Sequence, residues 1–106
     1  MGEYHNGCVW PWVTAEYVAL KAKIAREHPD PAVRDRYRGE AVRDLADLAR
    51  LFEGAGGAWE VFDPETRGPA LRLRMGLRRY VPPRDFLGSL AGFAGVCLRL
   101  KALGWV

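Results

Sequence analysis

The stretch that most constrains the fold lies near the end of the chain, where residues 85–103 predict a helix that is apolar on nearly every side. Its apolar residues are Phe86, Leu87, Leu90, Ala91, Phe93, Ala94, Val96, Cys97, Leu98 and Leu100. A helix without a polar face must be buried on all sides. Because a chain of 106 residues has too few other elements to surround it, we expect part of the natural packing to come from elsewhere, through oligomerisation or a larger body.

Two further helices are predicted from apolar spacing and from their end signals. The first covers residues 11–26 and has proline in its first turn, where the missing N–H costs nothing. The second begins at Asp30-Pro31, a favourable N-cap followed by proline, and continues to about residue 53, where glycines end it. Its apolar stripe and charged remainder indicate a helix that packs one face and exposes the other.

Prolines and glycines punctuate residues 58–84 and predict a long irregular connection, which is uncommon in so small a chain and is usually functional or disordered. Weak alternation over residues 70–75 could form a short strand. The fold class that these patterns predict is all-α, with about three helices and one long loop.

Composition excludes several classes of function. The net charge of +3, from 16 basic and 13 acidic residues that are well interleaved, is too weak to indicate nucleic-acid binding by itself. No uncharged apolar run is long enough for a membrane span, and no signal peptide is visible. Cys8 and Cys97 make neither a disulfide framework nor a zinc site, although a single bridge between them stays open. We therefore expect a cytoplasmic protein.

No metal and no cofactor are expected. His5 and His28 are far apart and lack metal-ligand spacing. The chain has no phosphate-binding loop, no dinucleotide fingerprint and no nucleophile elbow.

One segment near the start of the sequence contains many groups that bind sugars: Tyr4-His5-Asn6-Gly7-Cys8-Val9-Trp10-Pro11-Trp12. Indole faces cover the C–H patches of a sugar ring, while asparagine, histidine and tyrosine side chains hydrogen-bond to hydroxyls. The purely structural alternative is a helix N-terminus with an aromatic staple.

The long connection contains a segment in which carboxylates lie among aromatic residues: Trp59-Glu60-Val61-Phe62-Asp63-Pro64-Glu65-Thr66. A carboxylate beside apolar neighbours can serve as a general acid or base, because such neighbours shift its pKa. The structural alternative is an Asp-Pro turn with solvated acids.

These segments resemble glycogen-debranching enzymes of the amylo-α-1,6-glucosidase type and, more distantly, glycoside hydrolase family 63 and mannosylglycerate-hydrolase-like enzymes. Residues 4–12 match the family segment YHNGTVWPW, with Cys8 where threonine or serine is usual. Residues 60–66 are similar to the segment that carries the general base, which falls on Glu60. Residues 85–89 resemble the segment DFSWSA that opens the last inner helix, but Gly88 stands where tryptophan is normal, which puts one wall of a sugar site in doubt.

The resemblance implies a six-fold α/α barrel, of which residues 1–106 would be a single partial domain at the C-terminal end. Residues 11–26 would then be an inner helix, 31–53 an outer helix and 85–103 the final inner helix. The implied chemistry is inverting glycoside hydrolysis with two carboxylates, of which the general acid is absent from this chain. Glu60 would be the catalytic base that activates water. The implied substrate-binding residues are His5, Asn6, Trp10, Trp12 and Asp63.

We therefore expect a carbohydrate-active fragment that is inactive alone, since one carboxylate cannot both protonate the leaving group and activate water. Its expected partners are an α-glucan or other oligosaccharide, and either a second chain that supplies the rest of the barrel or further copies of itself. The alternative is a non-catalytic, truncated helical module that self-associates. A weaker alternative is an arginine-rich RNA-binding domain, whose binding would depend steeply on salt.

Overall fold

The computed structural model describes residues 9–70, 73–75, 78–80 and 84–106. Three helices contain most of these residues: α1 (Pro11–Glu27), α2 (Pro31–Ala55) and α3 (Leu87–Ala102). Two short strands, β1 (Leu73–Met75) and β2 (Arg78–Tyr80), form an antiparallel pair in which Leu73 lies opposite Tyr80. The all-α fold class is confirmed, and every helix boundary lies within two residues of its predicted position.

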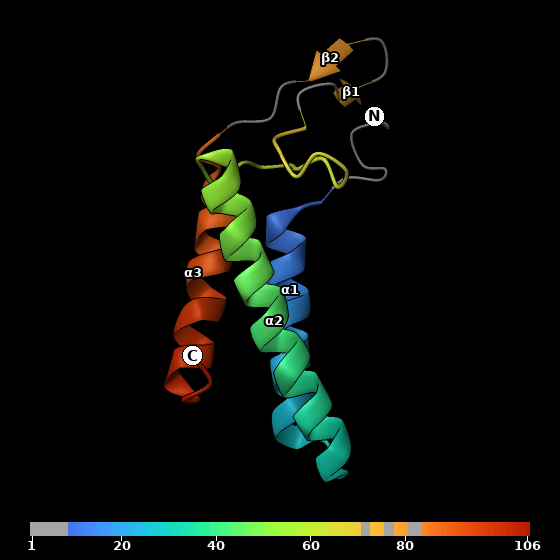
Figure 1. Cartoon of the computed structure of the whole chain (residues 1–106), viewed down its shortest axis with the longest axis vertical. Helices are drawn as coiled ribbons and strands as arrows, with labels where there is room; N and C mark the ends of the chain where they lie inside the picture. Colours follow the sequence, from blue (N-terminus) through green and yellow to red (C-terminus); the bar gives the residue numbers. More distant parts are fainter. Residues whose placement is uncertain (1–8, 71–72, 76–77, 81–83) are drawn as a thin grey trace.

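The three helices lie side by side in an elongated body (Figure 1). Helix α2 runs antiparallel to α1 along most of its length, and α3 runs parallel to α1. The segment that follows α2 and the β1–β2 pair lie together at the end of the bundle where α1 begins. The long connection is therefore gathered at the same end as the aromatic start of α1.

The ends of α2 follow from local chemistry. The Asp30 carboxylate accepts a hydrogen bond of 2.9 Å from the backbone N–H of Ala32, and Pro31 occupies the first turn. At the other end, Gly56 adopts a left-handed conformation with φ 69°, which glycine tolerates without steric cost. The helix continues past Gly54 and ends at Ala55, two residues beyond the predicted end.

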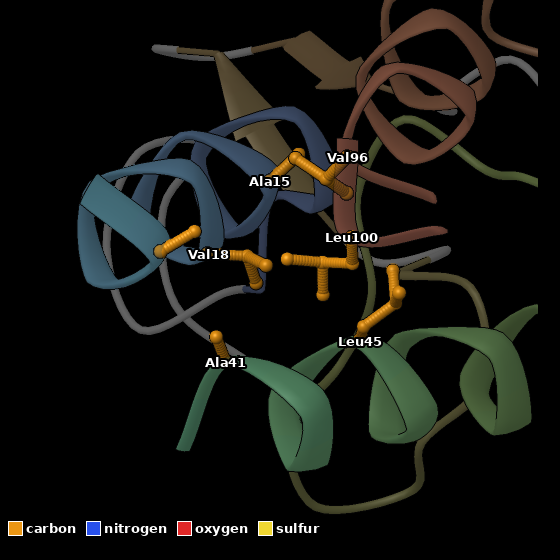
Figure 2. Close-up of a cluster of buried hydrophobic side chains, with 7 residues drawn as sticks. Ala15, Val18, Ala41, Leu45, Val96 and Leu100 are labelled. Carbon is orange, nitrogen blue, oxygen red and sulfur yellow. The ribbon is translucent and has the colours of Figure 1, made fainter. Parts of the chain in front are cut away.

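The main core lies where the three helices meet (Figure 2). Leu100 of α3 is fully buried and reaches between Val18 of α1 and Leu45 of α2. Small residues such as Ala15 and Ala41 let the helices approach closely at this level. Full burial of each large apolar side chain here contributes about 1.5–3 kcal/mol.

A second apolar cluster joins the long connection to the helices. Phe62, which is fully buried, packs against Leu48 and Leu51 of α2. The Phe52 ring stands edge-on to the Phe93 ring of α3, with ring centroids 5.3 Å apart. The connection is thus anchored by its own aromatic residue, which limits how far the segment around it can move.

The outward face of α3 is apolar and exposed. Leu87 is 76% exposed, Leu90 43% and Leu98 68%. Part of the apolar surface of α3 is therefore left uncovered in this structure. None of the helices in the described part of the chain is long and apolar enough to cross a membrane.

Candidate functional site

The segment that carries Glu60 is held on both sides by backbone hydrogen bonds. Phe62 pairs with Val9 through two bonds, of 2.8 and 2.9 Å, although 52 positions separate them from each other in the chain. On the other side Phe62 faces Pro69 in an antiparallel bridge, and the N–H of Ala70 donates to the carbonyl of Val61. The start of α1 is thereby brought beside the predicted base.

The first turn of α3 is fixed to the same segment. The N–H of Phe86 donates to the carbonyl of Ala58 over 3.1 Å. The hydroxyl of Ser89, which is fully buried, donates to the carbonyl of Trp59 over 3.0 Å. These two bonds hold the two residues that precede Glu60 against the start of α3.

These contacts surround an open hollow of about 640 Å³ between the starts of α1 and α3. It is lined by Trp10, Trp12, Glu16, Glu60, Phe86, Gly88, Ala91 and Gly92. Three of the predicted site residues, Glu60, Trp10 and Trp12, therefore lie around one space. Glu60 is only 7% exposed, which argues against the alternative that it is a solvated acid, whereas Trp12 is 45% exposed.

The hollow is acidic and aromatic. Glu60 and Glu16 contribute carboxylates, and none of the lining residues that the structure describes is basic. Such a surface suits an uncharged ligand that offers hydroxyl donors to the carboxylates and apolar faces to the rings. Among the residues that the structure describes, no three His, Cys, Asp or Glu residues gather where they could hold a metal ion.

Asp63 lies elsewhere and has a structural role. Its carboxylate accepts hydrogen bonds from the N–H groups of Glu65, at 2.8 Å, and Thr66, at 3.4 Å. It therefore caps the Asp-Pro turn, as the structural alternative for this segment proposes. Asp63 lines a separate cavity of about 250 Å³ against α2, with Asp44, Asp47 and Arg67 among its neighbours. The structure does not bring Asp63 together with Glu60.

Two of the predicted sugar contacts, His5 and Asn6, lie outside the described residues, as does Cys8. Cys97 is a free thiol on α3, and burial raises its pKa, which keeps it protonated at neutral pH. On α3, Gly92 faces Ala15 of α1 at close range, whereas a Cβ placed on Gly95 would meet nothing within 4 Å.

Sequence reasoning missed three residues of this site: Phe86, Ser89 and Glu16. Phe86 and Ser89 belong to residues 85–89, which the sequence predicts as the start of a helix, but their partners, the carbonyls of Ala58 and Trp59, are about thirty positions away. Only tertiary structure reveals such pairings. Glu16 occupies a helical position four residues after Trp12, so helical spacing could have placed both on one face.

Comparison with models of protein families, with curated proteins and with solved structures finds no match for this chain.

Proposed function

We propose that this chain is the base-bearing part of an inverting glycoside hydrolase that acts on an α-glucan or a related oligosaccharide. The observation that carries the proposal is the hollow in which the buried Glu60 carboxylate lies together with Trp10, Trp12 and Phe86. In this role Glu60 removes a proton from water as the water attacks the sugar ring. The indoles hold the ring through its C–H faces.

The proposal includes a partner. A second carboxylate must act as general acid, and inverting enzymes place the two carboxyl groups about 6.5–9.5 Å apart, with water between them. The exposed apolar face of α3, formed by Leu87, Leu90 and Leu98, supports docking of further helices of an α/α barrel. We assign these helices to a second chain, and we place the complex in the cytoplasm, where a free thiol such as Cys97 persists.

The test is to combine the chain with the product of the neighbouring reading frame and to assay glucose release from branched oligosaccharides. The chain alone should be inactive, and the complex should release glucose with inverted anomeric configuration. Glu60→Gln should lower the turnover of the complex by roughly 10²–10⁴-fold, because it removes the general base. Glu65→Gln is the matched control: it lies in the same connection but is exposed and outside the hollow, and it should leave turnover unchanged.

Absence of a complex, or equal turnover of Glu60→Gln and Glu65→Gln, would contradict the proposal. A second candidate function, a self-associating helical module, is favoured by the same apolar face of α3. A stable symmetric dimer without affinity for maltooligosaccharides would support that candidate instead.

A further inference from the structure

One wall of the hollow is formed by the start of α3. Glycine at position 88 offers no side chain, yet it lines the hollow together with Phe86. A Cβ atom placed on Gly88 would lie 2.7 Å from Cε1 of Phe86, 3.3 Å from Cζ and 3.4 Å from Cδ1. The Phe86 ring therefore occupies the space that a side chain at position 88 would fill.

The backbone of Phe86 is held firmly. Its N–H donates to the carbonyl of Ala58, and its carbonyl accepts from the N–H of Leu90 in the first turn of α3. Ser89 repeats the attachment to the connection one turn further on, through the carbonyl of Trp59. The backbone at the start of α3 is thus tied to residues 58 and 59, directly before Glu60, so that Phe86 and Glu60 line the same hollow.

The ring also remains accessible, because Phe86 is half-buried rather than enclosed. Trp10 and Trp12 contribute from the start of α1, and Phe86 from the start of α3. A pyranose ring placed in the hollow would meet aromatic surface from both helices and carboxylates from Glu60 and Glu16. Among the described residues that line the hollow, none is a cation that would attract a phosphate or a uronic acid.

We propose that Phe86 is a specificity-determining residue of this site: its ring, seated beside Gly88, is the aromatic wall on which an uncharged glycosyl unit stacks within reach of Glu60. This inference rests on the proposed function. Gly88 has a permissive role, since any larger residue there displaces the ring.

The test is titration of the whole chain with maltotriose, followed by tryptophan fluorescence and by amide chemical shifts. Phe86→Leu keeps an apolar side chain but removes the ring, and it should raise the Kd for maltotriose roughly tenfold. Phe86→Tyr keeps the ring and should bind like the parent chain. Gly88→Ala should weaken binding comparably, because its Cβ moves the end of a flexible side chain while favouring the helix.

Tyr17→Leu is the matched control. Tyr17 is an exposed aromatic residue on α1 that does not line the hollow, so its replacement should not change the Kd. If the parent chain binds maltotriose but Phe86→Leu and Gly88→Ala bind equally well, the role of Phe86 is wrong and the proposed function stands. If the parent chain does not bind maltotriose at all, both the role of Phe86 and the sugar site fail.

Discussion

Helices α2 and α3 both pack against α1, but their outward faces differ in kind. The outward face of α2 carries charged residues, among them Arg36, Arg43 and Arg50. Its opposite face buries apolar residues, among them Leu45 and Leu48. The outward face of α3 carries Leu87, Leu90 and Leu98 instead. An exposed apolar face of this kind supports the proposed docking of a partner. Helix α2 thus has one buried apolar face and one charged face, whereas α3 exposes apolar side chains to solvent.

The helix starts differ in the same way. The N-terminus of α2 is capped by its own Asp30, whereas the N-cap residue of α3, Phe86, makes no side-chain cap. The start of α3 depends instead on hydrogen bonds to Ala58 and Trp59. The start of α2 is therefore stabilised by a neighbouring residue. The start of α3 is stabilised by the distant residues Ala58 and Trp59, and the same hydrogen bonds bring α3 to the hollow.

The largest expected effect on the free energy of unfolding is the difference between substitutions on the buried and on the exposed face of α3. Leu100→Ala removes a fully buried side chain from the core and should lower the free energy of unfolding by about 3 kcal/mol. Leu98→Ala, on the exposed face, should change it by less than about 0.5 kcal/mol. Chemical denaturation of both variants measures the difference. Equal losses would mean that the outward face of α3 is already covered in solution.

The next effect concerns the contact between α1 and α3. A Cβ on Gly92 would lie 3.1 Å from Cβ of Ala15 and 3.5 Å from Cα of Trp12, so Gly92→Gln should force the helices apart and destabilise the chain by about 1–3 kcal/mol. Gly95→Gln meets nothing within 4 Å and should stabilise α3 by about 0.5–1 kcal/mol through helix propensity. Thermal unfolding monitored by circular dichroism compares them. The same sign for both variants would refute the close approach at Gly92.

A smaller effect should sharpen the contrast in helix starts. Asp30→Ala removes the carboxylate that accepts from the Ala32 N–H and should cost about 1 kcal/mol. Asp35→Ala is the control, because Asp35 is exposed in the same helix and makes no cap. Urea denaturation should show a lower midpoint for the first variant only. A comparable fall in the control would point to general helix charge instead.

The smallest effect concerns the ion pair between α1 and α2. Lys21 donates to Asp44, and this hydrogen bond raises the pKa of the lysine above its ordinary value of 10.5. Because the folded pKa is the higher one, the stabilisation is complete below pH 10.5 and disappears as the pH rises through the raised value. Lys21→Met should cost about 0.5–1 kcal/mol at neutral pH.

Stability measured against pH checks this last prediction. The parent chain should lose more stability above pH 10.5 than Lys21→Met does. The exposed pair of Arg50 and Asp47 lies within α2, so Arg50→Met serves as the comparison and should have less effect. Identical alkaline profiles for the parent chain and Lys21→Met would exclude a role for the ion pair.

Much of the fold could be predicted because its signals are local. Asp30-Pro31 and the glycines after Phe52 set the bounds of α2, and apolar spacing identified all three helices. The weak alternation at residues 70–75 predicted a strand, and its described residues 73–75 form β1. The partner strand β2 was not predicted, because strand pairing depends on a second segment. The bridges of Phe62 to Val9 and Pro69 were missed for the same reason.

The candidate site, too, could be predicted only in part from the sequence. The resemblance of local segments to those of known enzymes pointed to Glu60, Trp10 and Trp12, and the structure gathers these three around one hollow. The same reasoning included Asp63, whose carboxylate instead caps a turn and faces a different cavity. A segment shows which chemistry is present, but it does not show in which direction each side chain points.

By itself the sequence determined the three helices, their ends and an apolar surplus in α3, because each depends on residues within a few turns of one another. Only the tertiary structure decided that α1 and α3 meet at Gly92, that Phe86 occupies the space beside Gly88, and that Glu60 lies between the two helix starts. These arrangements depend on hydrogen bonds and packing between segments far apart in the chain, and no local pattern encodes them.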